Sequence, residues 1–292
     1  MTAAAPLPSF LVIGAVKAAT TWLHGQLQAH PEIYLPDPEP HFFSREYDRG
    51  LDFYRTFFAD AEPHQVVGEK SADYLAHPLA PARVAASLRR APLVVQLRNP
   101  VDRAYSDYKM LYRRGTVTGD PERYLTPGRS EQPRFLDDGL YARHLERWFD
   151  HFAPGQLLVL LYEDVKQDPQ GTVNRVCDHI GVTRHYREDV GAQRFNDGAE
   201  QFLPLSIRRA LAPIKDAVQP LRGHAAFEVA RSLLAREIRY PPLAPDLRAR
   251  LQDHYATDIE ALERLIGRDL GNWLPSAARR PQVASELVTQ NG

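Results

Sequence analysis

The sequence predicts an α/β fold in which helices flank both faces of a parallel β-sheet, followed by a helical C-terminal region. Short apolar runs alternate with amphipathic segments over residues 9–181, the pattern of successive strand and helix units. The first run ends in glycine and leads through a turn into a helical segment. Beyond about residue 200, we expect strands to stop and helices to take over.

Four runs rich in β-branched residues or leucine are predicted to be buried strands, because polar or turn residues bound each of them. They are residues 9–14 (SFLVIG), 65–69 (QVVGE), 92–98 (PLVVQLR) and 156–163 (QLLVLLYE). Helices are predicted at residues 20–29, 51–60, 78–91, 101–115, 140–152 and 168–181. Right-handed crossovers between parallel strands would place such helices on both faces of the sheet.

We expect one domain, with a core over about residues 9–200, a helical cap over about 201–275 and a frayed tail over 276–292. The cap contains a predicted helix at 244–267 with one apolar stripe, formed by Leu247, Leu251, Ile259, Leu262 and Ile266. Packing within the chain is the simplest role for this stripe, and a homodimer interface is the alternative. Residues 116–138, rich in Pro and Gly, are typical of a lid, a binding loop or a mobile excursion.

The composition gives no sign of a nucleic-acid-binding or membrane-spanning protein. The chain of 292 residues has a formal net charge of −1, which gives no sign of a nucleic-acid partner. Its single cysteine, Cys177, sits in a helical context typical of a core residue. No run approaches the roughly 18 apolar residues of a membrane span, and no secretory leader is evident, so we expect a cytoplasmic location.

GAVKAATTWL, residues 14–23, lies between the first predicted strand and a helix. It lacks the second glycine of the nucleotide loop G-x-x-x-x-G-K-[ST], which argues against an ATP- and magnesium-dependent kinase. Lys17, Thr20 and Thr21 at a helix start are nevertheless suited to an anion such as a 5′-phosphate. The alternative is that Thr20 only caps the helix and Lys17 is a solvated charge.

A second segment, LRNPVDRAYSDY, places Arg98 at the C-terminal end of a predicted strand and Ser106 on the helix that follows. Ligands of open α/β sheets collect at this edge, so we expect Arg98 to meet the same molecule as Lys17. The guanidinium group matches phosphate oxygens. Two separate phosphate sites predict a nucleotide that is phosphorylated at both ends.

Together these segments resemble the sulfotransferases that use 3′-phosphoadenosine 5′-phosphosulfate (PAPS), nearest in pattern to the heparan-sulfate-type carbohydrate enzymes and their bacterial relatives. GAVKAATTWL is similar to the family's 5′-phosphosulfate loop, and LRNPVDRAYSDY to its 3′-phosphate segment. PEPHFFS (38–44), GEKSADYL (68–75) and YARHLERWFDHF (141–152) match further motifs in the family's order. The resemblance covers about residues 9–180 and implies a P-loop-like fold.

The resemblance implies a nucleotide site on two segments. The 5′-phosphosulfate would be wrapped by Lys17, Ala18, Ala19, Thr20, Thr21 and Trp22, and the 3′-phosphate held by Arg98 and Ser106. Ala19 stands where many members have glycine, so we expect the turn to do without a positive φ there. The late basic loop of many members is not recognisable, and Arg194 is the nearest candidate. The product would be 3′,5′-adenosine bisphosphate (PAP).

The resemblance also implies the catalytic groups. Glu39 matches the family's catalytic glutamate, and His41 and Lys70 match positions that line the acceptor pocket. Glu39 would be the base, although His41 could be the base or could orient Glu39. Lys17, with Lys70 as a second cation, would stabilise the leaving phosphate without a metal. The acceptor would be a small molecule or carbohydrate, such as a bacterial secondary metabolite or glycoconjugate.

Weaker patterns favour ordinary structural roles. Glu69 is interpreted as a salt-bridge partner of a neighbour, and Tyr141, His144 and Trp148 share one helical face that indicates core packing. Two alternative functions remain at this stage: a P-loop phosphotransferase that uses ATP and magnesium, and a nucleotide-binding protein without catalysis. The presence of Lys17, Glu39 and Lys70 argues against the second.

Overall fold

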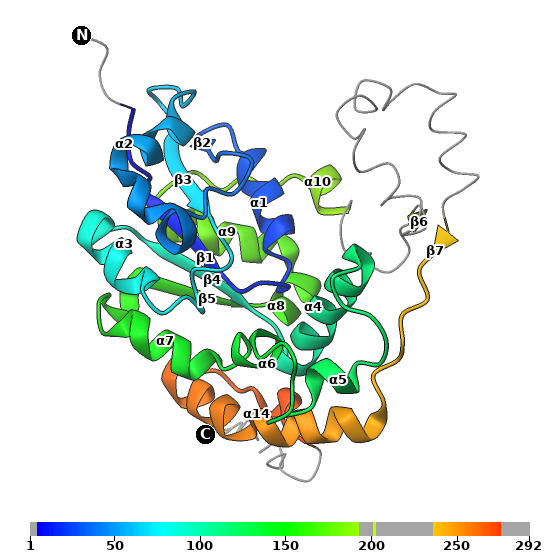
Figure 1. Ribbon diagram of the computed structural model, residues 1–292. Helices are drawn as coiled ribbons and strands as arrows, with labels where there is room; N and C mark the ends of the chain where they lie inside the picture. Colours follow the sequence, from blue (N-terminus) through cyan, green and yellow to red (C-terminus); the bar gives the residue numbers. More distant parts are fainter. Residues whose placement is uncertain (1–4, 193–200, 203–235, 276–292) are drawn as a thin grey trace, which may run out of the picture.

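The computed structural model describes residues 5–192, 201–202 and 236–275 of the chain. Its main sheet has five parallel strands in the order β2-β3-β1-β4-β5 (Figure 1). The four predicted strands are confirmed as β1 (Phe10–Gly14), β3 (Val66–Lys70), β4 (Leu93–Leu97) and β5 (Leu157–Leu161). The sequence missed β2 (Ile33–Tyr34), an edge strand too short to show a pattern.

The predicted helices are present, with bounds that differ by a few residues. They are α1 (Thr20–Gln28), α2 (Gly50–Arg55), α3 (Ala80–Leu88), α4 (Pro100–Arg114), α7 (Tyr141–Phe149), α9 (Pro169–Ile180) and α14 (Pro245–Ile266). Shorter helices are α8 (Tyr162–Gln167) and α10 (Glu188–Ala192). The expectation that strands stop at about residue 200 is wrong, because β6 (Gln201–Phe202) and β7 (Arg236–Glu237) form an antiparallel pair.

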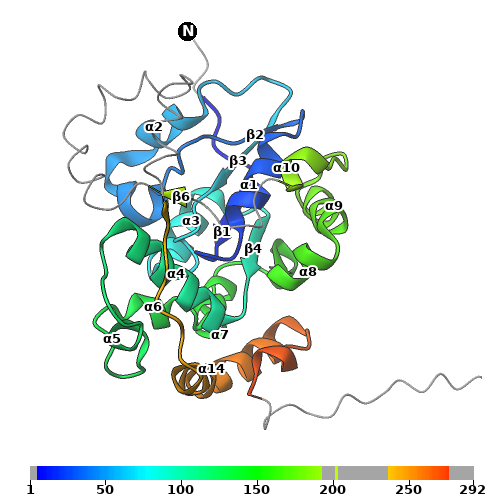
Figure 2. The same cartoon turned by 90° about the vertical axis from the view of Figure 1, so that its right-hand side faces the viewer.

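Alternate residues of the strands enter two separate cores, which confirms that both faces of the sheet are covered. Leu11 and Ile13 of β1 pack in one apolar cluster, whereas Phe10 and Val12 pack in the other. This follows from the two-residue period of a strand. Figure 2 shows α1, α8 and α9 on one side of the strands, and α3 and α4 on the other.

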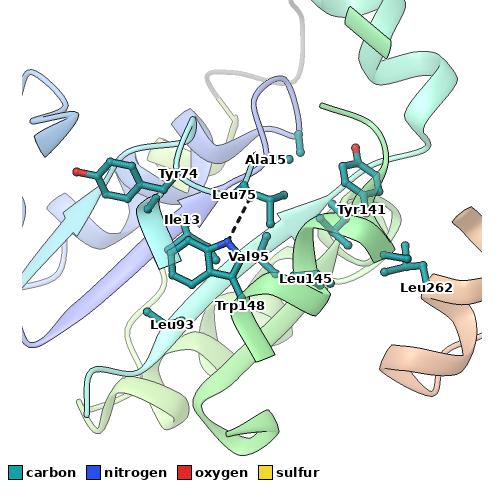
Figure 3. Packing of buried hydrophobic residues seen from close by; sticks show 14 of the residues in the cluster. Ile13, Ala15, Tyr74, Leu75, Leu93, Val95, Tyr141, Leu145, Trp148 and Leu262 are labelled. Carbon is teal, nitrogen blue, oxygen red and sulfur yellow. Dashed lines mark hydrogen bonds between the residues drawn. The ribbon is translucent and has the colours of Figure 1, made fainter. Parts of the chain in front are cut away.

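The face covered by α7 contains the largest buried side chains (Figure 3). Trp148 is fully buried, and its Nε1 donates a hydrogen bond of 3.2 Å to the Leu75 carbonyl oxygen. Tyr141 and His144 on the same helical face are also buried, and burial lowers the pKa of His144 to about 4. The predicted role of this face in core packing is confirmed.

The C-terminal helix α14 lies against α7 and α4, outside the sheet (Figure 1). Four of the five stripe residues are buried there, and Ile266 is partly buried. Most of the stripe therefore packs within the chain.

Residues 116–138 are a packed part of the fold. They contain the short helices α5 (Glu122–Leu125) and α6 (Arg134–Asp137), which contact α4. Leu125 and Phe135 are fully buried. The abundant Pro and Gly of this segment shape its turns and do not make it the mobile excursion that its composition suggests.

Candidate active site

Three basic residues lie at the carboxyl ends of neighbouring strands, at the same edge of the sheet. β3, β1 and β4 are adjacent and parallel, so their carboxyl ends meet at one edge. Lys17 follows β1, Lys70 ends β3, and Arg98 follows β4. This edge is where open α/β folds bind ligands.

The loop 15–19, which joins β1 to α1, contains two left-handed residues: Lys17 has φ 69° and Ala19 has φ 64°. The expectation that Ala19 avoids a positive φ is wrong. The left-handed residue sits at the N-cap of α1, and alanine adopts this conformation there despite its Cβ. Turns with alternating left-handed residues direct backbone N–H groups to one concave side, which suits an anion.

Gln96, near the C-terminal end of β4, holds this loop in place. The Ala15 N–H donates to the Gln96 carbonyl oxygen at 2.7 Å, and the fully buried Gln96 side chain donates through Nε2 to the Ala18 carbonyl oxygen. Close packing fixes the start of the loop as well. A Cβ at Gly14 would lie 2.7 Å from the Leu75 Cβ, so only glycine fits.

The N-terminus of α1 has no side-chain cap. The N-cap residue is Ala19, which has no side-chain hydrogen bond, and therefore the alternative that Thr20 caps the helix is wrong. Thr20 is buried and Thr21 is exposed at the first turn. The first N–H groups of any helix lack intrahelical acceptors, so this end is suited to hold an anion.

Arg98 lies beside the loop 15–19. Its Nη1 donates to the Lys17 carbonyl oxygen at 3.4 Å, and its guanidinium carbon lies 4.7 Å from the centre of the Tyr162 ring. Tyr141 Oη also donates to the Arg98 carbonyl oxygen at 2.9 Å. The structure therefore brings the two predicted segments together at one edge of the sheet.

The other residues predicted to bind nucleotide differ in accessibility. Ser106 is 7% exposed on α4, about 9 Å along the helix axis from its first residue. Ala18 is fully buried, and Trp22 packs in the core on the α1 side of the sheet. Because their side chains are buried, Ala18 and Trp22 shape the loop by packing and do not present side chains to solvent. Arg194 lies outside the described residues.

Glu39 and Lys70 form an ion pair at the same edge. Lys70 Nζ donates to Glu39 Oε1, while the Ala72 N–H donates to Glu39 Oε2 at 3.1 Å. The Lys70 side chain is 4% exposed and that of Glu39 is 29% exposed. Solvent therefore reaches the carboxylate, and the ammonium group lies beneath it.

His41 is held by a carboxylate that sequence reasoning missed. Its Nδ1 lies 2.7 Å from Asp73 Oδ1, and its Nε2 lies 4.0 Å from Glu39 Oε2. The hydrogen bond with Asp73 raises the pKa of His41, although burial opposes the shift. Burial would raise the pKa of Asp73, but the His41 bond and the charges of His41 and Arg45 lower it.

Glu69 is not the salt-bridge partner that the sequence suggests. Its fully buried carboxylate accepts hydrogen bonds from Ser71 Oγ at 2.6 Å and from the Tyr54 and Tyr74 hydroxyls. Burial raises the pKa of Glu69 to about 7, against the lowering effect of these bonds. Ser71 Oγ accepts from the His41 N–H at 2.9 Å. Glu69 therefore supports the backbone of residues 39–44 from below.

Sequence reasoning missed Asp73, Gln96 and Tyr74, whose hydroxyl also accepts from the Phe43 N–H at 3.0 Å. Their partners His41, Ala18 and Phe43 are about 30 to 80 residues away in the chain. Asp73 carries one usable signal, since it is an acidic residue just beyond the strand that ends at Lys70. Gln96 carries another, as a polar residue inside an apolar strand. A buried amide needs partners, and here they are the loop 15–19.

Residues 7–194 match the family model of the sulfotransferase domain. The chain belongs to this family. Mouse heparan sulfate glucosamine 3-O-sulfotransferase 3B1 is 36% identical over 186 residues, which are 61% of this chain and 47% of the mouse protein. The human bifunctional heparan sulfate N-deacetylase/N-sulfotransferase 3 is 31% identical over 94% of this chain and 31% of its own length. The chain thus spans about half or less of these relatives.

The crystal structure of a sulfotransferase from Alicyclobacillus acidocaldarius is similar over nearly its whole length. The TM-score is 0.68 at 27% identity, over 92% of this chain and 99% of that one. The sulfotransferase fold predicted from the sequence is confirmed. Within the described ranges, no helix is long and apolar enough to cross a membrane. Nor do those residues contain a group of three or more His, Cys, Asp or Glu side chains that could hold a metal ion.

Proposed function

We propose that this protein transfers a sulfuryl group from PAPS to a hydroxyl or amine of a small-molecule or carbohydrate-like acceptor. The observation that carries the proposal is the contact between Arg98 Nη1 and the Lys17 carbonyl oxygen at 3.4 Å. It brings together the two segments to which we assign the phosphates, as a nucleotide with phosphates at both ends requires.

The 5′ end of the donor fits the loop 15–19 and the uncapped start of α1. Lys17 supplies charge, Thr21 supplies an exposed hydroxyl, and the backbone supplies N–H donors. Arg98 and Ser106 fit the 3′-phosphate, since a guanidinium group and a hydroxyl both donate to phosphate oxygens. Ala18, Ala19, Thr20 and Trp22 shape this site.

Bound PAPS supplies the sulfuryl group and a phosphate leaving group, so the protein contributes alignment and charge. In this proposal Lys17, which follows β1, stabilises the leaving phosphate, and Lys70, at the end of the neighbouring strand β3, is a second cation. The proton of the acceptor must pass to a base on the other side of the reacting group. Glu39 and His41, 4.0 Å apart, are the candidates.

The names of the relatives support a carbohydrate-like acceptor, since they act on heparan sulfate and include both 3-O- and N-sulfotransferases. Those relatives have additional length, and loops that shape acceptor pockets vary independently of the scaffold. A cytoplasmic location and a homodimer stay predictions of the sequence.

Thermal shift tests the donor assignment. PAP without magnesium is expected to raise the melting temperature, whereas ATP with magnesium has little effect. Stronger stabilisation by ATP with magnesium would favour the kinase instead. Transfer of labelled sulfate from PAPS to a panel of sugars, phenols, nucleosides and lipids then identifies the acceptor. PAP binding without transfer to any of them would indicate a nucleotide-binding protein.

A further inference from the structure

We propose that Asp73 is a positioning residue of this active site. It holds His41 as a cation whose Nε2 faces Glu39, so that Glu39, and not His41, accepts the proton of the acceptor. The proposal rests on the proposed function for the identity of the reaction. The arrangement of the three side chains stands independently of it.

The geometry fixes the His41 ring. Asp73 Oδ1 is hydrogen-bonded to His41 Nδ1 at 2.7 Å. Asp73 Oδ2 accepts hydrogen bonds from Ser44 Oγ at 3.0 Å and from Arg45 Nε at 3.1 Å. With both carboxylate oxygens engaged, Asp73 cannot turn away. Nε2 is left as the ring nitrogen that faces Glu39 Oε2, at 4.0 Å.

The backbone of His41 is held as firmly as the ring. The residue has a left-handed conformation with φ 50°, its N–H donates to Ser71 Oγ at 2.9 Å, and its carbonyl oxygen accepts from the Arg45 N–H at 2.8 Å. A side chain fixed at both ends loses little entropy when it acts on a neighbour. This rigidity suits a group that orients Glu39.

The charges around His41 favour the imidazolium. Asp73 and Glu69 face it from the end of β3, and Glu39 and Arg45 face it from its own loop. Lys70 pairs with Glu39. The hydrogen bond and charge of Asp73 raise the pKa of His41 most, Glu39 adds to this effect, and burial and Arg45 oppose it. An imidazolium has no lone pair, so a protonated His41 cannot be the base.

A titration of the histidine ring signals by NMR, on protein labelled with ¹³C at Cε1, tests the pairing without any assay of activity. His41→Gln identifies the signal by its loss. Asp73→Asn is expected to lower the midpoint of His41 by about 1 unit or more, since it removes an opposite charge in direct contact. Arg45→Gln is the matched control, and it shifts the midpoint upward because Arg45 opposes the protonation of His41. An unchanged midpoint in Asp73→Asn, in protein that melts cooperatively, overturns the proposal.

The pH dependence of kcat then separates a positioning cation from a base. If His41 works as a cation, Asp73→Asn moves the alkaline limb to lower pH, because the ring loses its proton earlier. If His41 is the base, the acidic limb moves to lower pH and the proposal fails. A uniform loss of kcat with both limbs fixed would mean a purely structural Asp73. Should no acceptor react, the NMR result stands and only the proposed function falls.

Discussion

Two loops meet at the carboxyl edge of the sheet, and they are built in opposite ways. The loop 15–19 is shaped by its own backbone, with left-handed residues at Lys17 and Ala19 and a helix N-terminus beside it. The loop 39–44, whose last three residues begin the short helix Phe42–Glu46, is held by side chains of the segment after β3, through Ser71, Asp73 and Tyr74. Backbone geometry suits the recognition of a constant donor, whereas side-chain contacts can set the position and charge of a reacting group.

Replacement of Glu39 is expected to have the largest effect, and it should lower kcat without changing the binding of PAP. Glu39→Gln keeps an oxygen for the Ala72 N–H but removes the basic carboxylate, so kcat should fall between about 100- and 10,000-fold. PAP affinity should change by less than about twofold, since Glu39 is assigned to the other loop. Steady-state kinetics and calorimetry measure the two quantities. Glu46→Gln, at a half-exposed position just beyond this loop, is the control. Equal loss of kcat and of PAP binding would contradict the division between the loops.

The second effect concerns the buried support of the loop 39–44. The pKa of Glu69 rises from 4.5 to about 7 on folding, so the folded state holds this proton more tightly than the unfolded state. Its contribution to stability is complete below pH 4.5 and is lost as the pH rises to about 7, by at most about 3 kcal/mol. Denaturant unfolding at several pH values should show that the free energy of unfolding falls between pH 4.5 and about 7, and Glu69→Gln should remove this pH dependence. The same pH dependence in Glu69→Gln would contradict its assignment to Glu69. Glu62→Gln, at an exposed site, is the control.

The two loops also differ in how far the sequence predicted them. The four central strands, the helices on both faces and the positions of Lys17 and Arg98 follow from local patterns of hydrophobicity and charge. The role of Asp73 does not, because its partner His41 is 32 residues away and only the fold joins them. The positive φ of Ala19 was also missed, since sequence preferences favour glycine there. The meeting of Lys17 and Arg98 could be predicted because both follow strands of one parallel sheet, whereas the individual side-chain contacts of Asp73 and Gln96 could not.

The third prediction concerns the contribution of Arg98, which contacts the loop 15–19, to PAP binding. Arg98→Ala should weaken PAP binding by about 1.5–3 kcal/mol, the usual value of a charge-assisted hydrogen bond. Calorimetry measures the change, and Arg90→Ala, at an exposed position before β4, is the control. Equal effects from the two arginines would indicate general attraction of charge and no defined 3′-phosphate site.

The smallest effect contrasts two hydroxyl groups. Thr21 is exposed at the start of α1, so Thr21→Ala should weaken PAP binding by about 0.5–1.5 kcal/mol and change the free energy of unfolding by less than about 0.5 kcal/mol. Ser71→Ala should do the reverse, because Ser71 is buried between Glu69 and the His41 N–H. Melting curves and calorimetry on both variants test the contrast, which fails if the two behave alike.

In the proposed site one nucleotide lies across the sheet edge, with its 5′ end at Lys17 and its 3′ end at Arg98. Calorimetric titration of Lys17→Ala and Arg98→Ala with 5′-AMP and 3′-AMP tests it directly. We expect Lys17→Ala to weaken 5′-AMP and spare 3′-AMP, and Arg98→Ala to do the opposite. If both variants weaken both nucleotides alike, or neither variant weakens either, the two side chains do not hold the two ends of one donor.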